Sequence, residues 1–250
     1  MTELEKFREA FLKVRNFGEF SSNRTGNTGI GKTLEDAIGV VENNLDVPDL
    51  HGFEIKSKRA LSESYVTLFT KAPTFPPKIN NKLRLQYGSN DLHFPDVKVL
   101  HTSIFATQWN THSSGFSYKL NLDDGQRKLF LLVKRLTDGV IVENNVYWTY
   151  DVINAIVTTK LKNLAFVQAD TSFKNGNEHF TFKSCTLYGG LTLTKLIAHI
   201  ANGSIMFDIR VGAYKNKDNI RTYGKMHDHG SGFRIKKEKL KSLYGNEQEL

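Results

Sequence analysis

The stretch Val47-Pro48-Asp49-Leu50-His51-Gly52-Phe53-Glu54-Ile55-Lys56 places two carboxylates and a lysine at a turn and along a short strand. Side chains alternate between the two faces of a strand, so Glu54 and Lys56 share one face while the residues between them pack inward. Asp49 comes from the turn that leads in, where its carboxylate can meet Glu54 over one hard cation such as Mg²⁺. This pattern is typical of metal-dependent nucleases, in which the lysine orients or helps to deprotonate the attacking water.

A turn of this kind followed by Glu-x-Lys also occurs by chance, so the rest of the chain has to support the interpretation. The chain has 250 residues, of which 39% are hydrophobic, enough to bury the core of one large or two small domains. Lys and Arg number 34 against 26 Asp and Glu, giving a net charge of +8 and a pI near 9.4. That surplus favours a polyanionic partner, because each neutralised phosphate releases counterions.

The location of the protein follows from its cysteine content and its first residues. One cysteine, Cys185, excludes an internal disulfide and suits the reducing cytoplasm. The amino terminus is charged where a signal peptide would be apolar, and no apolar run is long enough to span a bilayer. We therefore expect a cytoplasmic protein with no membrane contact, in which Cys185 is a packing residue.

Hydrophobic periodicity predicts a mixture of helices and strands. A glycine-rich loop at 18–33 separates the first two predicted helices. The predicted helices cover residues 3–15, 32–41, 81–87, 150–161, 193–201 and 236–244. The predicted strands are that of Glu54, a neighbouring strand at 65–70, and strands at 128–134, 140–148, 164–168, 180–188 and 204–214. The mixture indicates an α/β (α+β) fold with a mixed central sheet flanked by helices. No repeat or linker divides the chain.

Residues 26–33, Gly-Asn-Thr-Gly-Ile-Gly-Lys-Thr, satisfy the phosphate-loop pattern letter for letter. A working phosphate loop follows a buried apolar strand, but the preceding residues 20–25 are polar. No later hydrophobic strand ends in a suitable magnesium-binding aspartate. A nucleotide triphosphatase is therefore the weaker alternative, and the glycines instead allow a DNA phosphate to approach the backbone near Lys32.

Several blocks of sequence together resemble the MvaI/BcnI-type restriction endonucleases. In chain order they are residues 26–36, the Asp49, Glu54 and Lys56 set, residues 67–73 with Lys71, residues 208–214, and residues 227–235. The helix of Glu35 and the strand of Glu54 are also similar to the mismatch-repair nicking endonuclease MutH.

The resemblance implies a PD-(D/E)xK fold with two lobes around a DNA cleft, a catalytic lobe at about 1–110 and a recognition lobe at 111–250. It implies a Mg²⁺-dependent type II restriction enzyme that acts as a monomer on double-stranded DNA. Relatives cut short, nearly palindromic sites of the CCNGG or CCWGG kind, one strand at a time. A cognate DNA methyltransferase is then expected in the host.

The resemblance also assigns the catalytic residues. Asp49 and Glu54 hold the metal, Lys56 assists the nucleophilic water, and Glu35 matches a further acidic position near the metal. Without the resemblance, Glu35 and its neighbour Asp36 would both be ordinary residues of a helix surface, and Asp36 is left out of the catalytic set.

Sequence recognition needs a different set of residues. In residues 205–214, alternation makes one face apolar, so Arg210 and Tyr214 share the other face, where Arg210 can contact guanine with two hydrogen bonds. The resemblance places His227, Asp228, His229 and Arg234 in the recognition region. Lys32 and Lys71 are also expected to contact DNA. Two alternatives compete: a transition-metal site at His227 and His229, for which no third ligand is evident, and a structural ion pair between Arg210 and Asp208.

Three other functions remain open at this level. A mismatch-repair nickase would cut one strand and need partner proteins, and a nucleotide triphosphatase would depend on Lys32. A non-catalytic DNA-binding protein would tolerate amides in place of Asp49 and Glu54.

Overall fold

The computed structural model describes residues 1–40, 47–62 and 65–250, which form two compact units. The first unit comprises residues 1–64, 154–195 and 237–250, and the second comprises residues 65–153 and 196–236. The units interleave along the chain, so no single cut in the sequence separates them. The expected end of the second helix at Val41 lies outside the described residues.

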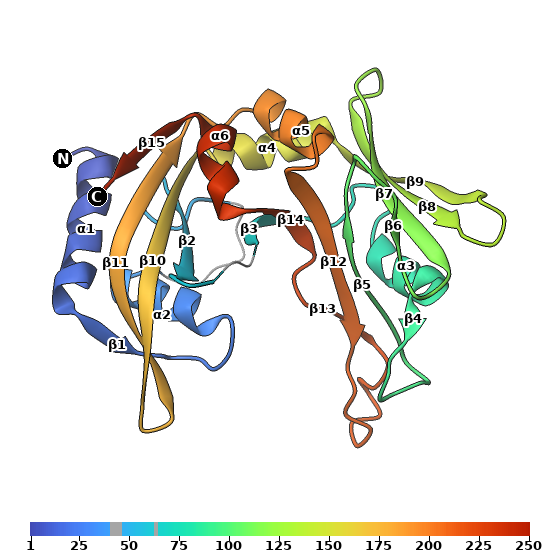
Figure 1. Ribbon diagram of the computed structural model, residues 1–250, viewed down its shortest axis with the longest axis horizontal. Coiled ribbons are helices and arrows are strands. Elements are labelled where there is room, and N and C mark those ends of the chain that lie inside the picture. Colours follow the sequence, from blue (N-terminus) through green and yellow to red (C-terminus); the bar gives the residue numbers. More distant parts are fainter. Residues whose placement is uncertain (41–46, 63–64) are drawn as a thin grey trace. The chain divides into compact units, whose positions relative to one another are not determined.

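The first unit is built on a mixed five-stranded sheet (Figure 1). The strand order is β1 (Glu19–Ser21), β11 (Asn177–Gly189), β10 (Asn163–Lys174) and β2 (Glu54–Arg59), and β15 (Asn246–Glu249) also pairs with β11. Strand β2 runs parallel to β10, whereas the other pairs are antiparallel. The strand that carries the candidate catalytic residues is therefore an edge strand, held by a partner more than a hundred residues later in the chain.

Two helices cover one face of this sheet. Helix α1 (Glu3–Phe17) begins with a capping box between Thr2 and Glu5. Helix α2 (Gly29–Ile38) begins three residues before its expected start at Lys32. A Cβ at Gly29 would lie 2.3 Å from the Arg24 carbonyl oxygen, so glycine lets the loop fold back tightly and the helix start early. The two helices bury Phe7, Phe11, Ile30 and Leu34 against Ile55, Ala165, Val167 and Phe182 of the sheet.

The remaining helices are short. Helices α4 (Tyr150–Thr159) and α5 (Leu193–Ala201) match their expected bounds closely, and the chain passes from one unit to the other within each of them. The helix expected at 236–244 is a 3₁₀ turn (Lys237–Lys239) followed by α6 (Leu240–Tyr244). None of the helices in the described part of the chain is long and apolar enough to cross a membrane.

The second unit contains two sheets. The six-stranded sheet has the order β3 (Val66–Thr70), β14 (Gly232–Ile235), β12 (Ile205–Ala213), β5 (Lys98–Ile104) and β4 (Ser89–Asn90), with β13 (Met226–Asp228) also on β12. The four-stranded sheet has the order β6 (Asn110–Thr111), β7 (Phe116–Asp123), β8 (Lys128–Arg135) and β9 (Ile141–Thr149). Helix α3 (Ile79–Tyr87) completes the unit. Trp148, Phe207 and Phe233 pack in its core with ring centroids 4.7 to 5.4 Å apart.

The mixed α/β class and most of the expected elements are confirmed. The expected neighbour relation between the strands at 54–59 and 65–70 is wrong, because β3 pairs with β14 in the second unit and β2 pairs with β10. The hydrogen-bond partners of both strands come from distant parts of the chain. Strands β5 and β7 were not anticipated.

Gly232 provides a test of the packing in the second unit. A Cβ at this position would lie 2.5 Å from the Phe69 carbonyl oxygen, so Gly232→Ala must push β14 away from β3. We expect it to destabilise the protein by about 1–3 kcal/mol, the usual cost of overpacking. Gly125→Ala, with a nearest contact of 3.4 Å in an exposed turn, is the control. Thermal unfolding should give a lower midpoint for Gly232→Ala alone, and equal midpoints would contradict this account.

Candidate active site

Glu54 is the first residue of β2, and its side chain is almost completely buried, with 1% of its surface exposed. The parallel register sets Glu54 opposite Leu164 and Lys56 opposite Phe166. Phe53 and Ile55 belong to the core formed with α1 and α2. The expected alternation along this strand is therefore confirmed, with the apolar pair inside and the charged pair on the other face.

The turn before β2 positions Asp49. Leu50 and Phe53 exchange backbone hydrogen bonds of 3.1 and 2.9 Å, and Gly52 between them adopts a positive φ of 77°. One carboxylate oxygen of Asp49 accepts a 2.8 Å hydrogen bond from the Ile55 backbone N–H. The turn and the strand thus fix this carboxylate near Glu54, whose pKa responds to its charge.

His51 lies in the same turn, but it does not join the two carboxylates. Its Nδ1 lies 3.2 Å from a carboxylate oxygen of Glu3 on helix α1.

Glu54 lies between two lysines. The Lys56 ammonium donates to Oε1, and the Lys160 ammonium lies 3.6 Å from Oε2. Burial raises the pKa of the Glu54 carboxyl above its ordinary value, and the charge of Asp49 adds to this, while the two lysines oppose it without cancelling it. Tyr244 of α6 is also close, since burial and the charge of Glu54 both raise the pKa of its phenol. The site therefore keeps a carboxylate in surroundings that disfavour its charge.

The two carboxylates fit a small divalent cation. Glu54 Oε2 is buried and has no hydrogen-bond partner among the described residues, and the Asp49 carboxylate is fixed beside it. Hard oxygen donors of this kind suit Mg²⁺, which commonly uses one or two carboxylates and completes its shell with water and substrate phosphate. Within residues 1–40, 47–62 and 65–250, no group of three or more His, Cys, Asp or Glu side chains is placed to hold a metal ion.

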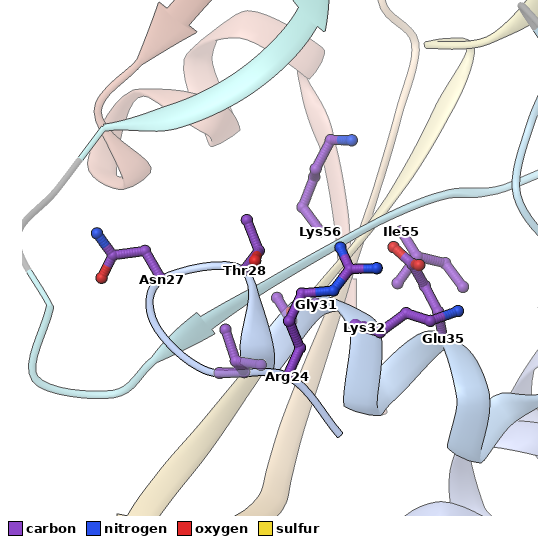
Figure 2. Close-up of a pocket in the computed structure, with 10 residues that line it drawn as sticks. Arg24, Asn27, Thr28, Gly31, Lys32, Glu35, Ile55 and Lys56 are labelled. Carbon is purple, nitrogen blue, oxygen red and sulfur yellow. The ribbon is translucent and has the colours of Figure 1, made fainter. Parts of the chain in front are cut away.

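The glycine-rich loop and helix α2 form a hollow beside Lys56. Figure 2 shows Arg24, Lys32, Glu35 and Lys56 around it, and Asn27, Thr28, Gly31 and Ser57 also line it. Glu35 comes from a helix on the apolar face of β2, yet it lines the same hollow as Lys56. Lys32 pairs with Asp36 at 2.9 Å. The only strand before this loop, among the described residues, is the three-residue edge strand β1, which is not the buried central strand that a phosphate loop requires.

In the second unit, Asp208 organises two arginines of the expected recognition set. Its carboxylate lies 2.9 Å from Arg234 Nε and 3.3 Å from Arg210 Nε. Arg234 is largely buried and also donates to the Gly230 carbonyl oxygen at 3.1 Å. The Arg210 side chain is half exposed. The pairing with Asp208 and a role in base contact are therefore compatible for Arg210, because the ion pair leaves the guanidinium accessible.

The other expected recognition residues gather at the end of β12. Tyr214 stacks on His227 with ring centroids 4.6 Å apart, and His227 lies 4.3 Å from His229. Asp228 makes several hydrogen bonds within the protein. Its Oδ1 accepts from the backbone N–H groups of Gly230 and Ser231 and from the Ser231 hydroxyl, and its Oδ2 accepts from the Asn80 side-chain amide at 2.9 Å. Asp228 thus shapes the loop that presents the two histidines. Lys71 follows β3, and its carbonyl oxygen accepts from the Trp148 indole at 3.0 Å.

A hollow in the second unit contains residues that sequence reasoning missed. Besides Asp208, Arg210 and His229, it is lined by His101, Thr102, Ser103, Asn110, Thr111, His112 and Ser113. Burial lowers the pKa of His101, His112 and His229 below the ordinary value. The alternation of Leu100, Thr102 and Ile104 along β5 was the available signal for this strand. Lys160 had no comparable signal, because only the fold brings it to Glu54.

The predicted residues separate into two groups. The first unit contains the predicted catalytic residues together with Lys32, and the second unit contains Lys71 and the residues expected to read DNA, namely Arg210, Tyr214, His227, Asp228, His229 and Arg234.

Comparison with known proteins found a matching family model and similar solved structures. The model of the MvaI/BcnI restriction endonuclease family matches residues 8–244. A solved structure titled "Restriction endonuclease MvaI-cognate DNA substrate complex" is 36% identical, with a TM-score of 0.87 over 98% of this chain and 96% of that chain. The structure titled "Restriction endonuclease MvaI in the absence of DNA" is 34% identical, with a TM-score of 0.63 over 100% and 98% of the two chains.

A comparison with curated protein sequences gave no significant match. The family model nevertheless covers most of the chain, and the similarity to both MvaI structures extends over nearly its full length. The chain therefore belongs to the MvaI/BcnI restriction endonuclease family and is a type II site-specific deoxyribonuclease.

Proposed function

We propose that this protein hydrolyses phosphodiester bonds of double-stranded DNA at a short pseudo-palindromic site of the CCWGG or CCNGG kind, with Mg²⁺ as its cofactor. We propose further that it acts as a monomer, cuts one strand at a time, and works in the cytoplasm beside a cognate methyltransferase. The observation that carries the chemistry is the buried Glu54 carboxylate, set between Lys56 and the turn that fixes Asp49.

In the proposed mechanism, Asp49 and Glu54 hold Mg²⁺, which when bound supplies a Lewis acid for the scissile phosphate and lowers the pKa of its water. Lys56 orients the attacking water and stabilises the negative charge that develops on the phosphate oxygens. Glu35 lines the same hollow as Lys56 and adds a carboxylate to its wall. Phosphoryl transfer asks the protein mainly for positioning and charge stabilisation, which these fixed side chains provide.

Recognition of the site belongs, in this proposal, to the second unit. Arg210 is held by Asp208 through Nε and so presents the outer edge of its guanidinium, which suits the O6 and N7 atoms of guanine. Tyr214, His227 and His229 form an aromatic group at the end of the same strand. Lys32 and Lys71 are proposed DNA contacts, and the net charge of +8 favours association with the polyanion.

Lys56→Ala should abolish cleavage and leave DNA binding largely intact, because it removes the group that serves the reacting water and not one that reads bases. The loss should be at least about 10²-fold, as is usual when a group that stabilises transition-state charge is removed. The assay is cleavage of unmethylated plasmid DNA in Mg²⁺, with binding to a cognate duplex measured in Ca²⁺. Lys183→Ala, on an exposed residue of β11, removes the same charge as a control. Cleavage by Lys56→Ala at the wild-type rate would refute the assignment.

The same plasmid assay separates the restriction enzyme from a mismatch-repair nickase. Linear product with common ends on both strands supports the proposal, whereas open circles that persist indefinitely would indicate a nickase.

Glu54→Gln should stabilise the metal-free protein at pH 8, although it should also prevent cleavage. The folded-state pKa of Glu54 lies above its ordinary value, so the wild type is penalised once the carboxyl ionises. The penalty should be absent below the ordinary carboxyl pKa, grow until the pH exceeds the raised pKa of Glu54, and stay constant above it. Thermal unfolding in EDTA across this pH range measures it. A wild type more stable than the variant at pH 8 would contradict the prediction.

Arg210→Ala should weaken both cleavage and discrimination of the cognate site. Loss of a bidentate contact to guanine costs about 1–3 kcal/mol of discrimination, or roughly fivefold to 160-fold. Arg221→Ala, at an exposed position of the same unit, is the control for loss of positive charge. The measurement compares kcat/KM on the cognate duplex and on duplexes with one changed base pair. Equal discrimination by the two variants would remove Arg210 from the set of base-reading residues.

A further inference from the structure

Lys160 is the residue near Glu54 that the proposed mechanism leaves without a role. It follows helix α4, and its backbone N–H continues the helical pattern with a 2.9 Å hydrogen bond to Ile156. Ile156, Val157 and Leu161 around it are buried, so the base of the side chain is fixed. Its ammonium lies 3.6 Å from Glu54 Oε2, and 23% of the Lys160 side chain is exposed. Lys160 therefore reaches a buried carboxylate from a position that retains contact with solvent.

The two lysines that flank Glu54 approach different oxygens of its carboxylate. Lys56 donates to Oε1 from the same face of β2, two residues along the strand. Lys160 faces Oε2, the oxygen that has no hydrogen-bond partner among the described residues. Oε2 is thus paired by charge alone, at a distance too long for a hydrogen bond. A metal ion that binds Oε2 can therefore displace Lys160 without breaking a hydrogen bond.

The charges around the buried carboxylate balance without a metal. Asp49 and Glu54 contribute two negative charges, and Lys56 and Lys160 contribute two positive charges. A buried carboxylate without a counter-charge is costly, so the two lysines reduce the cost of the Glu54 charge in the metal-free protein. A divalent cation that binds Glu54 brings its own charge, and Lys160 then repels it.

We propose that Lys160 is a positioning residue that pairs with Glu54 Oε2 in the metal-free enzyme and competes with the divalent cation for that oxygen. The proposal rests on the function proposed above, because it takes Asp49 and Glu54 as the metal ligands. Lys160 holds the ligand in place before the metal arrives, and by competing it raises the metal concentration that the enzyme requires.

Binding of Mn²⁺ to the full-length, DNA-free protein at pH 8.5 tests the proposal, with free Mn²⁺ measured by electron paramagnetic resonance. Lys160→Met keeps an unbranched side chain that is one atom shorter and removes its charge, so Mn²⁺ should bind more tightly, by about tenfold, since the repulsion acts at short range. Lys160→Arg keeps the charge and should bind Mn²⁺ as the wild type does. Lys162→Met, at an exposed position two residues away, controls for the change in net charge.

Thermal unfolding in EDTA gives a second readout that does not involve the metal. Lys160→Met should lower the midpoint in the wild-type background, because the Glu54 charge loses a partner. The same substitution should have no effect in a Glu54→Gln background, where there is no charge to compensate. A drop of equal size in both backgrounds would show a packing role and overturn the proposal.

The Mn²⁺ experiment separates this inference from the proposed function. If Asp49→Asn abolishes Mn²⁺ binding but Lys160→Met binds no more tightly than the wild type, the competition is refuted and the metal site stands. If the wild type does not bind Mn²⁺, or if Asp49→Asn binds it equally well, the metal site itself is wrong and the inference is refuted with it.

Discussion

The site depends on one buried charge, the Glu54 carboxylate. It lies on an edge strand where 1% of its side chain is exposed, and burial raises its pKa. The two lysines limit that cost, Lys56 on one oxygen and Lys160 near the other, whereas the charge of Asp49, which a tight turn holds close, adds to it. A carboxylate in such surroundings binds a cation more strongly than one in water, because the protein, not solvent, has to stabilise its charge. The burial of Glu54 therefore both destabilises the metal-free site and strengthens its affinity for a metal ion.

Much of the catalytic strand could be predicted from the sequence, because its chemistry is local. Residues 49–56 contain the turn and the strand, and the period of two decides which residues share a face. Helix α1 and strands β8 to β12 likewise show their periodicity within short windows. The early start of α2 could not be predicted from periodicity, because it depends on how closely Gly29 approaches Arg24.

What the sequence could not show is which distant segments meet. Lys160 lies more than a hundred residues from Glu54, and nothing in its neighbourhood marks it as a partner of a carboxylate. The pairing of β3 with β14 was missed for the same reason, since both partners of an antiparallel ladder must be known before either can be placed. Asp228 has internal contacts that its sequence position did not indicate, since it accepts hydrogen bonds from the loop that follows it and from Asn80.

The interleaving of the two units has a consequence for how the protein is made. Strand β2 needs β10, which is synthesised about a hundred residues later. A nascent chain on the ribosome therefore carries residues 49–56 without the sheet that buries Glu54 until β10 has been made. A chain that stops before β10 therefore lacks the strand against which the catalytic strand is folded.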